Sequence, residues 1–154
     1  MNIDYYKIPF GAQLLIWTTR IAFYGSCRTT PNKYEIIDIA YEKVGIKQGS
    51  FLLKTFLEII KKKKNFKIQP FCKRYLNETE INLINCIEVN KNQSKNNEFF
   101  VKEWDLVDQK KEFGIYAKKL AKKFREANLN TNVYKNNDYL ESFNKSNKNF
   151  RTLH

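Results

Sequence analysis

Histidine, glycine and cysteine are scarce in this chain of 154 residues, and each shortage argues against a class of functional site. The single histidine, His154, is the last residue, so a histidine-based catalytic or zinc site is not expected. The five glycines form no cluster of the kind that cradles phosphates in nucleotide-binding folds. The three cysteines are too far apart for a disulfide framework or a metal knuckle. We therefore expect a protein without cofactor, metal or catalytic activity.

Long apolar runs are also missing. The most apolar stretch, residues 10–24, contains several polar residues and is shorter than the roughly 20 apolar residues that cross a bilayer. The first residues include Asp4 and do not lead into the apolar run of a secretory signal. An odd number of cysteines is typical of free thiols in a reducing compartment. These features predict a cytoplasmic protein.

Apolar residues, at 42% of the chain, are sufficient for a core, and they recur with helical spacing. Thr30-Pro31 is typical of a helix start, and Gly45 suits the position after a helix end. Asn77-x-x-Glu80 resembles a capping box, and Gly114 is the expected division of the last, long helical segment. The predicted helices lie near residues 10–24, 30–44, 50–60, 77–90 and 98–128.

These helices predict an all-α protein built on a small orthogonal or bundle-like domain. We expect residues 1–90 to form a compact unit of about four helices. Residues 98–128 would pack on that unit or project from it as an arm. Asparagine, lysine and serine dominate residues 129–154, for which we expect a polar, disordered tail.

The formal charge is +12, from 28 basic and 16 acidic residues, and it is unevenly distributed. Residues 61–76 contain seven basic residues and no acidic one. Lysine far outnumbers arginine and the chain has 18 asparagines, a composition that an AT-rich genome also tends to encode. The charge thus has two explanations, a polyanionic partner or codon composition.

Residues 36–60 are the first candidate for a functional site. The sequence Gly45 to Leu52, with glycines at its first and fifth positions, resembles the turn and recognition-helix start of TetR-type bacterial repressors. The resemblance covers about fifteen residues, and Ala40 lies five positions before the first glycine rather than four. It implies a corner that reads DNA, and the alternative is a structural helical hairpin. The residues that would face the groove are Lys47, Gln48, Ser50 and Lys54, with Lys61 to Lys64 meeting phosphates.

The second candidate is the basic segment 61–75, in which aromatic residues are interleaved with cations. Proteins that bind single-stranded nucleic acids neutralise phosphates with cations and stack aromatic rings on bases. The alternative is a solvated loop whose aromatic residues point into the core. Because arginine is scarce, we expect phosphate contacts with little reading of bases. The candidate residues are Lys61, Lys62, Lys63, Lys64, Lys67, Lys73 and Arg74, interleaved with Phe66, Phe71 and Tyr75.

The segment 98–128 has a basic face opposite an apolar one. Such a helix could lie on a membrane surface, on an acidic protein partner or on nucleic acid, or pack its stripe against its own domain. Binding of DNA or RNA through the first two candidates is the leading hypothesis, and the acidic protein partner is the alternative. The cations of this segment are Lys118, Lys119, Lys122, Lys123 and Arg125, and its apolar stripe consists of Phe113, Tyr116, Leu120 and Phe124.

Overall fold

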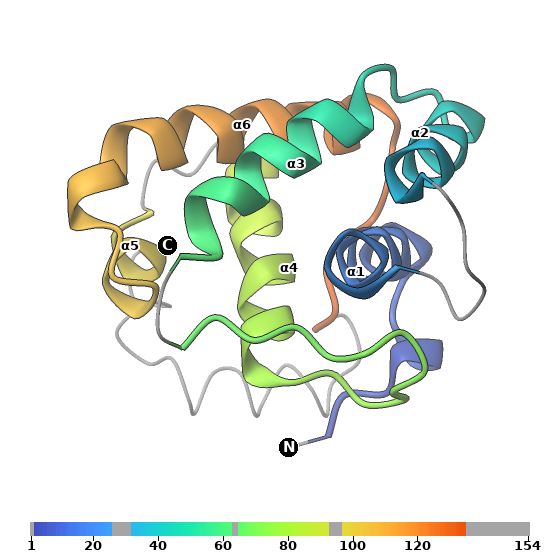
Figure 1. Cartoon of the computed structure of the whole chain (residues 1–154), viewed down its shortest axis with the longest axis horizontal. Coiled ribbons are helices and arrows are strands. Elements are labelled where there is room, and N and C mark those ends of the chain that lie inside the picture. Colours follow the sequence, from blue (N-terminus) through green and yellow to red (C-terminus); the bar gives the residue numbers. More distant parts are fainter. Residues whose placement is uncertain (1, 26–31, 63–64, 93–96, 135–154) are drawn as a thin grey trace.

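The computed structural model describes residues 2–25, 32–62, 65–92 and 97–134 (Figure 1). The predicted all-α class is confirmed, because the only extended pairing in these residues is one antiparallel bridge between Asp4 and Tyr75. Two 3-10 helices, η1 (Tyr5–Lys7) and η2 (Val107–Gln109), precede the first and last α-helices. The α-helices are α1 (Phe10–Tyr24), α2 (Lys33–Lys43), α3 (Gly49–Ile60), α4 (Glu78–Lys91), α5 (Glu98–Glu103) and α6 (Lys110–Glu126).

The helices α3 and α6 lie side by side in opposite directions, and α4 crosses beneath this pair (Figure 1). The helix α1 packs against both α2 and α4. A series of aromatic contacts joins α3, α6, the end of α5 and the segment that precedes α4, and each contact contributes about 0.5–1.5 kcal/mol beyond the area it buries. The ring centroids are 5.7 Å apart for Phe66 and Trp104, 6.0 Å for Trp104 and Phe113, and 5.9 Å for Phe113 and Phe56. The helix α6 is therefore part of the core and does not project as an arm.

Three helices end in the same backbone motif, in which a residue of positive φ follows the helix cap. This position is occupied by Gly45, Asp105 and Asn128, with φ of 88°, 52° and 55°. In each case the next residue is buried and donates its N–H to a carbonyl five residues earlier. These bonds run from Ile46 to Tyr41 (2.9 Å), from Leu106 to Val101 (2.7 Å) and from Leu129 to Phe124 (3.0 Å).

The predicted division of the last helical segment at Gly114 is wrong. Gly114 lies inside α6, and the chain instead turns at Asp105, which separates α5 from α6. Aspartate tolerates the left-handed conformation because its short side chain can bond to the nearby backbone. No glycine marks this turn, so the sequence pattern did not predict that α5 ends there.

The helix starts agree with the sequence in part. The capping box is confirmed, because Asn77 Oδ1 accepts from the Glu80 N–H (2.9 Å) and Glu80 Oε1 accepts from the Asn77 N–H (3.1 Å). The cap of α2 is Asn32, which accepts from two backbone N–H groups, whereas Thr30 and Pro31 lie outside the described residues. The helix expected near residues 50–60 begins at Gly49 and is preceded by Gln48, so Ser50, which the sequence favours as its cap, lies inside α3.

The predicted tail, 129–154, is wrong for its first residues, which pack against the core. Gly11 of α1 lies so close to the Asn130 backbone that any side chain at this position would overlap it. The remainder of the predicted tail, from residue 135, lies outside the described residues. The buried side chains of the packed part are those of Leu129, Thr131, Val133 and Tyr134.

Arg20 and Glu80 form an ion pair within the core, with side chains that are 2% and 0% exposed. Arg20 Nε donates to Glu80 Oε2 at 2.7 Å, and Nη2 donates to Oε1 at 3.0 Å. Arg20 Nη1 donates to the Lys73 carbonyl oxygen at 2.6 Å. One guanidinium group thereby joins α1, α4 and the segment that precedes α4. Removing one partner of such a pair leaves the other charged and buried.

Replacing either member of this pair should strongly destabilise the fold. We expect Arg20→Met and Glu80→Gln each to lower the free energy of unfolding by about 3–5 kcal/mol, measured by urea denaturation. The double variant Arg20→Met/Glu80→Leu should recover part of the loss, because it leaves no uncompensated charge.

The exposed ion pair between Lys61 and Glu58 provides the control for this prediction. Lys61→Met should cost at most about 1 kcal/mol, because water screens an exposed pair. Equal losses at the two pairs would contradict the role given to the buried one.

Candidate nucleic-acid interface

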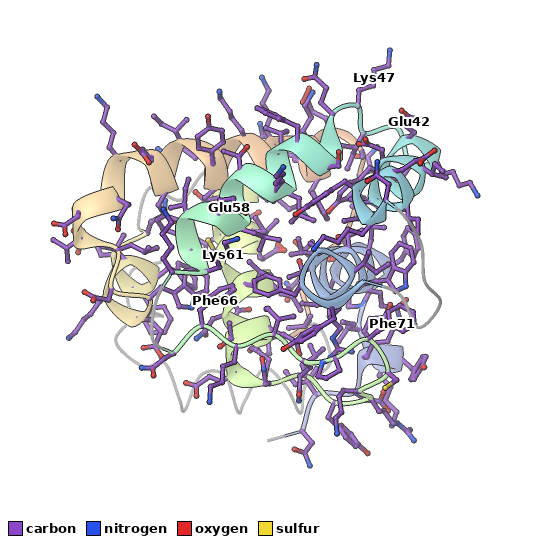
Figure 2. All side chains as sticks on the ribbon, in the orientation of Figure 1. Glu42, Lys47, Glu58, Lys61, Phe66 and Phe71 are labelled. Atoms are coloured by element: carbon purple, nitrogen blue, oxygen red, sulfur yellow. The ribbon has the colours of Figure 1, made fainter. Side chains whose placement is uncertain are left out.

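The corner between α2 and α3 is held in place by Tyr41. Its ring is buried and lies so close to Gly49 that a Cβ atom at that position would overlap it. Its hydroxyl is 2.9 Å from the hydroxyl of Thr18 on α1, and burial raises the pKa of Tyr41. These contacts fix the position of the corner. Lys47 lies at its tip and points away from the rest of the molecule (Figure 2).

The four residues predicted to face a DNA groove at this corner differ in exposure. Lys47, Gln48 and Lys54 are exposed, whereas Ser50 is half-buried and its N–H donates to an Asp38 carboxylate oxygen at 3.2 Å. Lys54 Nζ lies 5.1 Å from the centre of the Tyr34 ring. An exposed cation–π contact is worth about 0.5–1 kcal/mol, so the Lys54 ammonium can exchange the ring for a phosphate.

The basic segment begins on the same helix, at the C-terminus of α3. Lys61 Nζ donates to Glu58 Oε1 at 2.7 Å, and this bond holds the pKa of Glu58 below its usual value (Figure 2). Lys62 is exposed, while Lys63 and Lys64 lie outside the described residues. Lys61 and Lys62 therefore continue the basic surface that begins at Lys47.

The later part of the basic segment lies elsewhere. Residues 65–76 cross the lower part of the molecule in Figure 1, away from α6. Phe66 is buried and Phe71 is half-buried beside Trp17, so these two rings are core residues rather than free stacking surfaces. The remaining cations of this part, Lys67, Lys73 and Arg74, are exposed and do not join the surface of α3.

The apolar stripe of α6 does not form an exposed partner-binding surface. Phe113, Leu120 and Phe124 are 0% exposed and pack in the core, and Tyr116 is half-buried. The predicted partner-binding use is corrected for Phe113, Leu120 and Phe124, since a side chain without exposed surface cannot anchor a partner, whereas Tyr116 keeps part of its ring at the surface. The stripe faces α3 and α4 because those helices flank α6 on its apolar side.

Two adjoining grooves run between the outer surfaces of α3 and α6. Tyr116 and Lys119 line both, so the grooves are continuous along the helix pair. The groove at the C-terminal half of α3 is lined by Thr55, Glu58, Ile59, Lys62, Gln109, Glu112, Ile115, Tyr116 and Lys119. The groove at the α2–α3 corner is lined by Gln48, Phe51, Leu52, Tyr116, Lys119, Lys122, Lys123 and Glu126.

The two helices together present a lysine-rich surface, which we call the α3–α6 face. Four lysines come from the α2–α3 corner and α3, three from α6, and three glutamates accompany them. Phe51 is 61% exposed and Ile115 is 43% exposed on the same helices. Lys62, Lys119, Lys122 and Lys123 line the grooves together with Glu58, Glu112 and Glu126, and we include in the face the exposed lysines of the corner and of α3, which are Lys47, Lys54 and Lys61.

Sequence reasoning placed the lysines of residues 47–62 and those of α6 in separate candidate sites. The spacing of Lys119, Lys122 and Lys123 showed that they share one side of a helix. Nothing in that spacing identified α3 as the neighbouring helix, because helix neighbours depend on contacts distant in the sequence. The fold unites the two groups and divides the segment 61–75.

Known protein families, curated proteins and solved structures include none that matches this chain. In the part of the chain that the structure describes, no cluster of three or more His, Cys, Asp or Glu side chains could hold a metal ion. None of the described helices has both the length and the apolar character needed to span a membrane.

The pairing of Arg74 with Asp4 gives a prediction for acid pH. Arg74 Nε donates to Asp4 Oδ2 at 3.0 Å, and this hydrogen bond lowers the pKa of Asp4 below its usual value of 3.8. The pair therefore stabilises the fold above pH 3.8, and this stability is lost as the pH falls through the lower pKa of the folded state. We expect Arg74→Gln to raise the Asp4 pKa, measured by NMR titration of its carboxyl carbon.

Lys73→Gln is the control, because it removes a neighbouring charge without touching the hydrogen bond to Asp4. It should change the Asp4 pKa much less than Arg74→Gln. An unchanged Asp4 pKa in Arg74→Gln would mean that Arg74 is not its partner in solution.

Proposed function

We propose that the protein binds nucleic acid through its phosphates, with the α3–α6 face as the contact surface. The observation that carries the proposal is that Lys62, at the end of α3, and Lys119, Lys122 and Lys123 of α6 line the same pair of grooves. Three more exposed lysines, Lys47, Lys54 and Lys61, lie on the α2–α3 corner and on α3. Glu58, Glu112 and Glu126 line the same grooves, Lys61 is bonded to Glu58, and Glu42 is exposed beside the corner that carries Lys47 (Figure 2). A surface with this balance attracts a polyanion.

Phosphate neutralisation is the mechanism that fits these residues. Lysine carries a compact charge on a flexible stem, whereas the bidentate guanine contacts that read sequence mostly require arginine. The described arginines are engaged away from this face: Arg20 with Glu80, Arg74 with Asp4, and Arg125 with the Lys91 carbonyl oxygen. We therefore propose binding with little preference for base sequence.

The arrangement of α3 favours contact across phosphates over insertion into a DNA groove. Packed helices lie about 8–10 Å apart, and each is about 10–12 Å wide with its side chains. The pair α3 and α6 is thus broader than the major groove, which is about 12 Å wide. The α2–α3 corner resembles a helix-turn-helix, but α6 lies alongside the helix that would enter the groove.

The salt dependence of binding tests the proposal. We expect the purified protein to bind a labelled duplex in fluorescence anisotropy near physiological salt, with log K falling linearly against log salt. The triple variant Lys119→Gln/Lys122→Gln/Lys123→Gln should bind more weakly. Its salt slope should be shallower by about 0.9 for each of these lysines that contacts a phosphate.

A matched triple variant, Lys43→Gln/Lys102→Gln/Lys110→Gln, removes the same charge from exposed lysines that do not line the grooves. It should retain most of the affinity. Equal losses in the two variants, or binding only at low salt, would mean that the charge reflects composition. Equal affinity for polyglutamate would favour the alternative, an acidic protein partner.

A further inference from the structure

The N-terminal residues pair with the segment that precedes α4, far from the α3–α6 face. Asp4 and Tyr75 form an antiparallel bridge, flanked by hydrogen bonds from Tyr5 N–H to the Arg74 carbonyl (2.8 Å) and from Leu76 N–H to the Ile3 carbonyl (2.9 Å). Residues opposite each other between two such flanking bonds bring their side chains close together. The pairing therefore joins an N-terminal tyrosine segment to the end of the basic segment.

Two tyrosine rings are left exposed at this junction. Tyr6 is 73% exposed and Tyr75 is 45% exposed, although a buried aromatic side chain would stabilise the fold. Tyr5, which is half-buried, supports Tyr6 through an edge-on contact with ring centroids 5.3 Å apart. The Arg74 guanidinium lies 5.7 Å from the centre of the Tyr75 ring.

Three exposed cations belong to the same two segments as these rings. Lys7, Lys73 and Arg74 are exposed, and the Asp4 carboxylate is buried and bonded to Arg74. We call this set the tyrosine platform: Tyr6, Tyr75, Lys7, Lys73 and Arg74. Exposed rings beside cations are the two components that bind a single strand, since rings stack on bases and cations neutralise phosphates.

We propose that the tyrosine platform binds unpaired bases of a single-stranded nucleic acid. Stacking selects single strands because the faces of paired bases are covered by their neighbours in a duplex. Lys7 and Lys73 would neutralise the phosphates beside the stacked bases. The inference rests on the proposed function in one respect, because both require that the protein binds a nucleic acid. The two surfaces themselves share no residue.

An abasic strand separates stacking from charge. It keeps every phosphate but offers no ring, so it binds only through the electrostatic part of the interaction. We would measure anisotropy with a labelled oligothymidylate, with an abasic strand of equal length and with a duplex. The proteins compared are the wild type, Tyr6→Ala/Tyr75→Ala and Tyr6→Phe/Tyr75→Phe, each checked for native circular dichroism and melting temperature.

We expect the wild type to prefer oligothymidylate over the abasic strand by about tenfold or more. The alanine variant should lose this preference, the phenylalanine variant should keep it, and the duplex affinity should not change. Tyr24→Ala is the control, because Tyr24 is also exposed (58%) but lies at the end of α1.

Two results would overturn the inference: a wild type that does not distinguish the two strands, or an alanine variant that distinguishes them as well as the wild type. The outcome is separate from that of the proposed function. The α6 lysine variant reports on the duplex, whereas the tyrosine variants report on the difference between the two single strands.

Discussion

The ion pair between Arg20 and Glu80 is the contact on which the remaining arrangement depends. It is buried, so its desolvation has to be offset by well-formed hydrogen bonds, and each charged group has several. Glu80 also accepts the backbone N–H that starts α4, and Arg20 also holds the Lys73 carbonyl oxygen. The segment before α4 is thereby held against α1. Its next residues pair with the N-terminus, and that pairing creates the tyrosine platform.

The helix ends determine how α3 and α6 are arranged, and therefore the position of the α3–α6 face. The motifs at Gly45, Asp105 and Asn128 each turn the chain sharply and bury the hydrophobic residue that follows. The first turn starts α3, and the second places α6 alongside it in the opposite direction. The turns direct the apolar sides of both helices into the common core. The lysines on the opposite, polar sides of the two helices therefore share an exposed face.

The fold therefore distributes the basic residues over the surface in a way that the composition alone does not show. The densest basic segment does not form one patch, because Phe66 and Ile68 anchor its middle in the core and separate Lys61 from Arg74. One part joins α3 and the other joins the N-terminal tyrosines. The two proposed modes of contact differ accordingly, with phosphate neutralisation by lysines on the broad helix pair and stacking on exposed rings beside cations on the platform.

Local patterns were enough to predict the all-α class, the bounds of α1, the capping box at Asn77 and the helix end at Gly45, since each depends on residues within a few positions. They also placed the end of α6 near Asn128, but they failed at Asp105, where a residue other than glycine adopts positive φ. They also could not assign neighbours to α6, predict the packing of residues 129–134, or pair Asp4 with Tyr75. Those features depend on contacts between distant parts of the chain, which only the burial of a shared core selects.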